Sequence, residues 1–93
     1  MRELTMADFS PRLGKPFEIS AYGAKLSLRL EAAQDLPSLG RTGGSFRLEF
    51  VGPFQPALPQ ATYPFRFGDE WVGIFIVPVG QDQRGIRYEA IFV

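Results

Sequence analysis

The stretch from Trp71 to Val79 most constrains the fold, because it contains no charged residue and is apolar at both alternating sets of positions. In an extended strand one set contains Val72, Ile74 and Ile76, and the other contains Trp71, Phe75, Val77 and Val79. A strand that is apolar on both sides is typical of a sheet that is covered on both faces. We therefore predict a closed barrel or a sandwich around this strand, with Phe75 in the core.

Other segments alternate apolar and polar residues with the period of a β-strand and are bounded by turn residues. Together with the central stretch they predict about six strands, at residues 17–22, 25–33, 45–51, 61–67, 71–79 and 86–93. The inward set of the second strand is Leu26, Leu28, Leu30 and Ala32, and that of the last strand is Ile86, Tyr88, Ala90 and Phe92. The sequence thus predicts an all-β fold, a small antiparallel barrel or sandwich.

The predicted strands are joined by segments rich in glycine and proline, which indicate a loop at residues 35–44 and a turn at residues 80–85. Residues 52–60 contain three prolines, which cannot donate hydrogen bonds to a sheet, so this segment is predicted to be a crossover. Pro64 removes a donor from the fourth strand. That strand is therefore expected to lie, at least locally, at a sheet edge.

A short helical segment is predicted at residues 5–13, before the first strand. Thr5 and Asp8 have the spacing of a capping box, and Phe9 and Leu13 lie four residues apart on one helical face. Pro11 limits the length of this segment. We expect Phe9 and Leu13 to plug one open end of the barrel or sandwich.

The composition restricts the classes of function. With 93 residues the chain has room for one domain, so residues 1–93 are predicted to be a single β domain. Ten basic and ten acidic residues cancel, and without a basic run neither nucleic acid nor a membrane is an expected partner. No apolar stretch has the length of a membrane span and there is no cysteine, so a cytoplasmic location is expected.

Most catalytic chemistry is also disfavoured. The sequence contains no cysteine and no histidine, which excludes thiolate chemistry, histidine bases and the usual zinc ligands. Carboxylates remain, but no spacing marks two of them as a facing pair. We therefore expect no enzymatic activity, no cofactor and no metal site.

Three predicted strands carry an Arg-x-Glu pattern, in Leu28–Glu31, Phe46–Glu49 and Ile86–Glu89. Residues two apart share a strand face, so neighbouring strands would stack these charges on the outside of the sheet. The set is Arg29, Glu31, Arg47, Glu49, Arg87 and Glu89. The favoured interpretation is a charge ladder that provides solubility and register, and the alternative is a polar docking face for a partner.

A second candidate site combines aromatic and amide side chains that suit a sugar or peptide groove. The set is Phe54, Gln55, Gln60, Tyr63 and Trp71. In a domain of this size aromatic residues usually fill the core, which is the favoured interpretation.

Three motifs resemble those of a family of short bacterial proteins of unknown function. They are Leu-Pro-Gln-Ala-Thr-Tyr at 58–63, Phe-Ile-Val-Pro-Val-Gly at 75–80 and Tyr-Glu-Ala-Ile-Phe at 88–92. Ala61 stands where the family pattern has glycine, so the backbone there would bend differently if that position needs a positive φ. Members of the family often accompany phage-tail-collar-like proteins, and the resemblance implies a tail-related or adhesin-related accessory role.

We therefore expect a non-enzymatic protein-interaction or assembly module, with a protein partner or a second copy of the chain. The alternative is a small-ligand or carbohydrate-binding domain that uses the Phe54, Tyr63 and Trp71 region. An enzyme that works with carboxylates alone is the third possibility.

Overall fold

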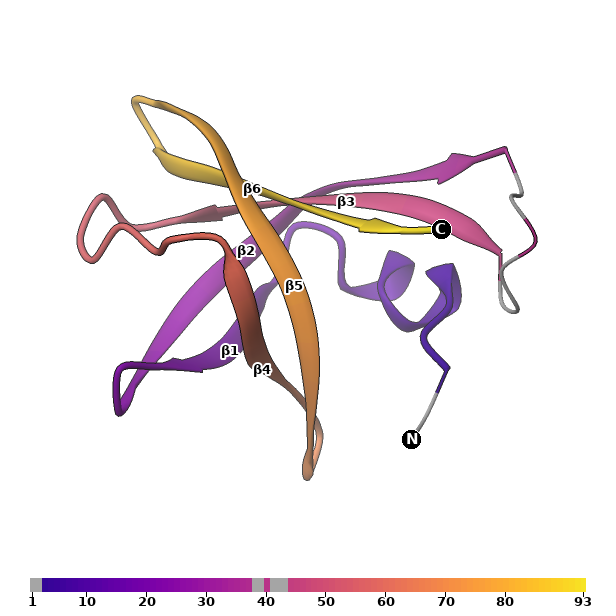
Figure 1. Cartoon of the computed structure of the whole chain (residues 1–93), viewed down its shortest axis with the longest axis horizontal. Helices are drawn as coiled ribbons and strands as arrows, with labels where there is room; N and C mark the ends of the chain where they lie inside the picture. The colour runs from indigo at the N-terminus through magenta and orange to yellow at the C-terminus, as the bar shows by residue number, and fades with distance from the viewer. Residues whose placement is uncertain (1–2, 38–39, 41–43) are drawn as a thin grey trace.

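Alternating apolar side chains build a closed antiparallel β-barrel (Figure 1). The structure is a computed structural model, and it describes residues 3–37, 40 and 44–93. The strands are β1 (Pro16–Ala21), β2 (Ala24–Leu36), β3 (Ser45–Gly52), β4 (Ala61–Phe67), β5 (Glu70–Asp82) and β6 (Gly85–Phe92). They follow one another around the barrel in the order β1-β2-β3-β6-β5-β4. The prediction of an all-β fold is confirmed, and of the two predicted forms, barrel and sandwich, the structure is a barrel.

The inward side chains of all six strands form the core, as the strand period requires. Tyr88 and Phe17, Phe46, Phe50 and Phe65 are among the largest fully buried residues, together with aliphatic side chains. In β6, Ile86, Tyr88 and Ala90 are buried and Phe92 is half-buried, which confirms the predicted inward set. Aromatic rings therefore fill most of the barrel interior.

The central strand β5 is covered on one face only. Ile74 and Ile76 are 2% and 0% exposed, whereas Trp71 and Phe75 on the other face are 42% and 52% exposed. The prediction that Phe75 belongs to the core is wrong. The reason is the barrel itself, because a single closed sheet has one interior, and the second apolar set of β5 lies on its outside.

The inward set of β2 also differs from the prediction. The register between β2 and β3 shifts between Leu30 and Ala32, as in a β-bulge. Beyond the shift Ala33, opposite Leu48, packs against the core, so the expectation for Ala32 is wrong. β2 also continues to Leu36, into the predicted loop. The rest of that loop prediction falls mainly on residues 38–39 and 41–43, which lie outside the described residues.

The N-terminal segment contains two short 3-10 helices, η1 (Met6–Asp8) and η2 (Ser10–Arg12). The Asp8 carboxylate accepts a 2.8 Å hydrogen bond from the backbone N–H of Thr5, as the capping-box spacing predicted. Phe9 lies between the two helices and is fully buried, but Leu13 is 52% exposed. The predicted plug is thus confirmed for Phe9 and wrong for Leu13, because a 3-10 turn followed by extended backbone does not keep residues four apart on one face.

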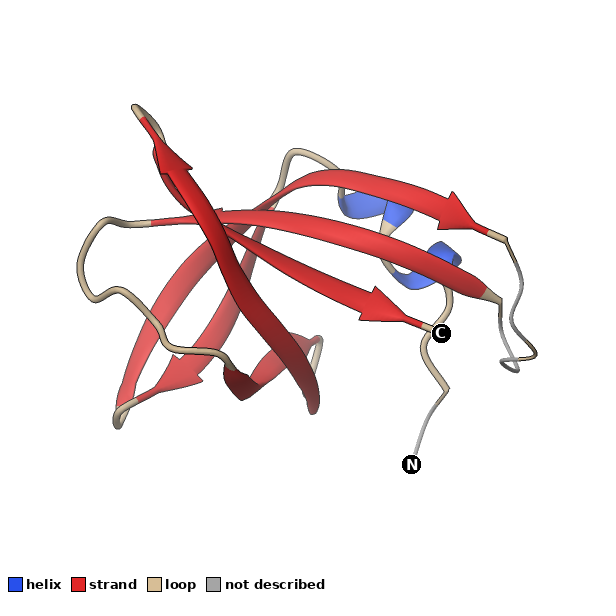
Figure 2. Cartoon of the chain, turned by 45° about the horizontal axis from the view of Figure 1, so that its top comes forward, coloured by secondary structure: helices blue, strands red, loops and turns tan. Residues whose placement is uncertain are grey.

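Phe9 closes one end of the barrel. Its ring lies 5.6–5.9 Å from four other rings: Phe17 in β1, Phe46 in β3, Phe67 in β4 and Phe92 in β6. Figure 2 shows both helical turns in blue, beside the part of the barrel where β6 ends. The N-terminal segment therefore belongs to the hydrophobic core.

The connections are close to those predicted. Residues 53–60 form no strand, but β5 extends to Asp82, so the turn before β6 is shorter than predicted. The register between β1 and β4 contains one pair, Ile19 with Phe65. Pro64 therefore has no partner in β1, as expected for a residue at a local sheet edge.

Ala61 is the first residue of β4, and its φ is not positive. Among the described non-glycine residues, a positive φ is found at Tyr22. In the described part of the chain no helix is long and apolar enough to cross a membrane.

Candidate functional site

Four of the six residues of the predicted charge ladder form one network on the outside of β3 and β6. Arg47 contacts Glu89 at 2.5 Å and Glu49 at 2.8 Å, so it bridges two carboxylates that lie opposite each other in the register. Arg87 then joins Glu49 at 2.7 Å to Asp82 at 2.6 Å. Cations and anions alternate along this network, as the ladder interpretation predicts.

The electrostatics of the network are those of mutually satisfied charges. Hydrogen bonds to Glu89 and Glu49 raise the pKa of Arg47, and the hydrogen bond from Arg47 lowers the pKa of Glu49. The pKa of Arg87 is raised by its hydrogen bonds to Asp82 and Glu49. Each charge of this network is therefore already paired within the chain.

The other two ladder residues lie outside this network. Glu31 forms an ion pair with Arg84 of the β5–β6 turn, and the sequence pattern did not indicate that residue. Arg29 is exposed on β2, where its register partner on β3 is Val51. The predicted six-residue face is therefore divided among separate contacts.

The five residues of the possible groove do not lie on one common surface. Tyr63 is 7% exposed, belongs to the core and donates a 2.7 Å hydrogen bond to the Pro59 carbonyl. Trp71 is 42% exposed and lies on the outer face of β5, across the barrel wall from the core. Phe54, Gln55 and Gln60 are exposed on the crossover between β3 and β4. For Tyr63 the favoured core interpretation agrees with the structure.

A largely apolar surface lies on the outside of β4 and β5, and it includes Phe75, which the sequence analysis placed in the core. We call it the β4–β5 outer face, and it comprises Thr62, Pro64, Arg66, Trp71, Gly73 and Phe75. The register pairs Arg66 with Trp71, Pro64 with Gly73 and Thr62 with Phe75. Arg66 is the one charged residue of this set, so the face is apolar over most of its length. In the sequence this face was indicated by the second alternating set of β5 residues, which contains no charge: Trp71, Phe75, Val77 and Val79.

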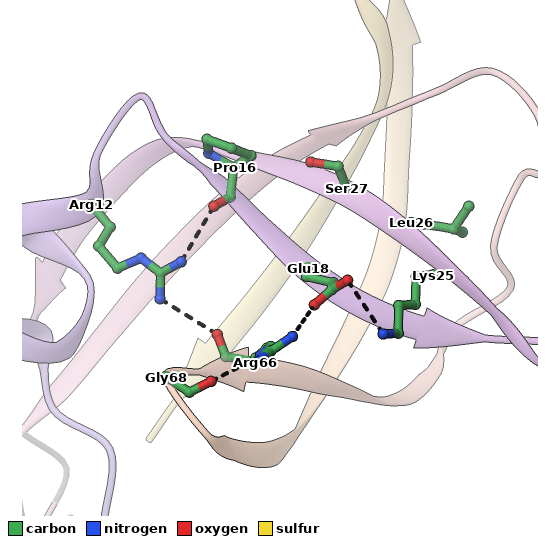
Figure 3. Close-up of a pocket in the computed structure, with 8 residues that line it drawn as sticks. All are labelled: Arg12, Pro16, Glu18, Lys25, Leu26, Ser27, Arg66 and Gly68. Carbon is green, nitrogen blue, oxygen red and sulfur yellow. Dashed lines mark hydrogen bonds and ion pairs between the residues drawn. The ribbon is translucent and has the colours of Figure 1, made fainter.

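Next to this face, β1, β2 and β4 line an open surface depression of about 580 Å³ (Figure 3). We call it the seam depression, because it lies where β1 and β4 share a single register pair. Glu18 of β1 reaches across the seam to Arg66 at 2.9 Å and lies 4.0 Å from Lys25 of β2. Three cationic side chains, those of Arg12, Lys25 and Arg66, thus line the same depression as one carboxylate.

Arg12 has a different environment from the other two cations. Its guanidinium carbon lies 3.7 Å from the centroid of the Phe17 ring, a cation–π geometry. It donates long hydrogen bonds to the carbonyls of Arg66 at 3.5 Å and Pro16 at 3.3 Å, one on each side of the seam. Partial burial lowers the pKa of Arg12. Sequence reasoning missed this residue, because nothing local marks an arginine that tertiary structure brings between two strands.

The fold and these surfaces define the chain as a small six-stranded antiparallel barrel that has a self-paired charged face, an apolar outer face and a cationic depression. Residues 4–92 match the family model described as "Domain of unknown function (DUF6916)". The chain therefore belongs to this family, in agreement with the resemblance to a family of unknown function. Comparisons with curated proteins and with solved structures found no match.

Proposed function

We propose that the chain is a non-enzymatic protein-interaction or assembly module that binds a partner protein through the β4–β5 outer face. The observation that carries this proposal is the exposure of Trp71 and Phe75, at 42% and 52%, on the same face of one strand. Large aromatic side chains are enriched at protein interfaces and often provide most of the binding energy. Burial of these two rings by a partner would remove both from water.

The contrast between the two outer faces supports the choice of surface. On β3 and β6 the outward side chains of Arg47, Glu49, Arg87 and Glu89 are charged and paired with one another, and Ile91 is an exposed apolar residue beside them. On β4 and β5 the outward positions between Arg66 and Phe75 contain proline and glycine, which leave the aromatic rings accessible. A solvated sheet face needs charges, and a docking face does not.

The partner that we propose is a phage-tail-like or adhesin protein, as the family resemblance implies. The absence of cysteine and histidine from the sequence supports the non-enzymatic part of the proposal. The groove alternative, a ligand site built on Phe54, Tyr63 and Trp71, has less support, because Tyr63 is buried while Trp71 faces outward.

The test is affinity purification of N-terminally tagged chain from its native host, with the co-eluting proteins identified by mass spectrometry. The informative comparison is between the double variant Trp71→Ser/Phe75→Ser and the control Phe54→Ser, because Phe54 is a similarly exposed aromatic residue on the crossover, at 47%. The proposal predicts a stoichiometric tail- or adhesin-like protein that the double variant loses and the control retains.

Light scattering on the purified chain tests the other occupant of this face. If the wild-type chain is a dimer and the double variant is a monomer, this face binds a second copy of the chain instead of a partner protein. The proposal would be contradicted if the chain is a monomer and no other protein co-purifies with it in stoichiometric amount. It would also be contradicted if the double variant still binds the partner.

A further inference from the structure

Three of the side chains that line the seam depression are cationic and one is acidic. The cations are Arg12, Lys25 and Arg66, and the one carboxylate, that of Glu18, already contacts both Lys25 and Arg66. Arg12 donates to backbone carbonyls only, and its ring contacts are with Phe17 and Phe67. In this depression one cation thus lacks an acidic partner, and the other two share one.

The contacts of Arg12 are weak for a guanidinium. Its two hydrogen bonds, at 3.5 and 3.3 Å, are longer than the usual 2.7–3.2 Å range, whereas Arg47 and Arg87 make charge-assisted bonds of 2.5–2.8 Å. Burial lowers the pKa of Arg12, while carboxylate partners raise the pKa of Arg47 and Arg87. An incoming anion would give Arg12 the short, charge-assisted bonds that it lacks.

We propose that the seam depression binds a carboxylate group, which Arg12 holds together with Lys25 and Arg66. Figure 3 shows the guanidinium of Arg12 and the Glu18–Arg66 pair lining the same depression, with Lys25 at its other side. A planar carboxylate matches the donor geometry of a guanidinium group. A carboxylate is also the group that Arg66 and Lys25 already contact, in the side chain of Glu18. This proposal does not depend on the partner proposed above.

The carboxylate has two chemical sources, an acidic peptide side chain and a sugar acid. The experiment titrates the ¹⁵N-labelled chain with acetyl-Glu-amide and with glucuronate, and uses acetyl-Gln-amide and glucose as their uncharged analogues. The indole N–H of Trp71 is a built-in reporter, because the guanidinium carbon of Arg66 lies 5.8 Å from the centroid of that ring. Backbone amides of Ser27 and Gly68 report on the depression itself.

The proposal predicts saturable shifts of these signals with at least one of the two acids and none with the uncharged analogues. The acid that binds more tightly identifies the source of the carboxylate. Shifts that stay linear, that sodium chloride reproduces at equal ionic strength, or that centre elsewhere on the chain would overturn the proposal. Tighter binding of inorganic phosphate would overturn the assignment to a carboxylate.

Charge variants separate binding from folding. Arg12→Gln should weaken binding about tenfold, and Lys25→Gln, which removes a 65% exposed ammonium and leaves the core intact, should weaken it about threefold. The control Arg84→Gln removes a paired arginine on the β5–β6 turn and should change the Kd by less than about twofold. Glu18→Gln should tighten binding, because it releases Arg66 and Lys25 from their carboxylate. Unchanged affinity in both Lys25→Gln and Glu18→Gln would contradict the proposal.

Discussion

Phe9 provides the sharpest test of the fold, because it lies outside every strand and yet is fully buried. Replacement by alanine would remove a ring that lies within 6 Å of four others, and it would leave a cavity where the 3-10 helices cover the barrel end. Phe→Ala substitutions in cores cost about 3 to 5 kcal/mol. That is a large part of the total stability of a domain, about 5 to 15 kcal/mol.

The assay is chemical and thermal unfolding of Phe9→Ala beside the control Leu13→Ala. In a domain of this size each kcal/mol lowers the Tm by about 4 to 8 °C, so the Tm of Phe9→Ala should fall by at least about 12 °C. Leu13 is 52% exposed, and its replacement should cost less than about 1 kcal/mol. Similar small losses for both variants would mean that the N-terminal segment is an appendage and not part of the cooperative core.

Three further predictions test other parts of the structure. Phe75→Ala should cost less than about 1 kcal/mol and Ile76→Ala about 2 to 5 kcal/mol in urea unfolding, and the reverse order would show that the two faces of β5 are misassigned. Tyr88→Phe should cost about 1 to 3 kcal/mol, because it leaves the buried N–H of Leu58 without its 2.9 Å acceptor; an unchanged unfolding midpoint would contradict this hydrogen bond. The hydrogen bonds from the two arginines lower the folded-state pKa of Glu49. The ionised Glu49 carboxylate therefore stabilises the fold fully when the pH is above the unfolded-state pKa, and this stabilisation is lost as the pH falls through the folded-state pKa. The Tm difference between the wild type and Glu49→Gln should therefore be present at neutral pH and shrink below about pH 4, and a difference that grows with acid would refute this sign.

The outward charges were predictable as a pattern but not as a set of contacts. The Arg-x-Glu repeats indicate which side chains leave the sheet on the same face, because residues two apart share a face. Which strands are neighbours decides the partners, so Arg47 meets Glu89 only because β3 lies next to β6. The pairing of Glu31 with Arg84 likewise depends on a turn distant in sequence.

The candidate sites were less predictable than the strands. The seam depression gathers Arg12, Lys25 and Arg66 from three separate segments, and no local spacing relates them. The groove alternative has less support for the opposite reason, since residues near each other in sequence, such as Tyr63 and Trp71, lie on opposite sides of the barrel wall.

The sequence by itself determined the strands, most of their inward side chains, the absence of cysteine and histidine, and the short N-terminal helical segment. These features follow from a side-chain period of two and from turn residues, which act over a few positions along the chain. Only the tertiary structure decided between barrel and sandwich, because closure depends on which distant strands pair. It also decided which apolar side of β5 is covered: Trp71 and Phe75 alternate with Ile74 and Ile76, both sets are apolar, and a closed barrel has one interior to bury them in.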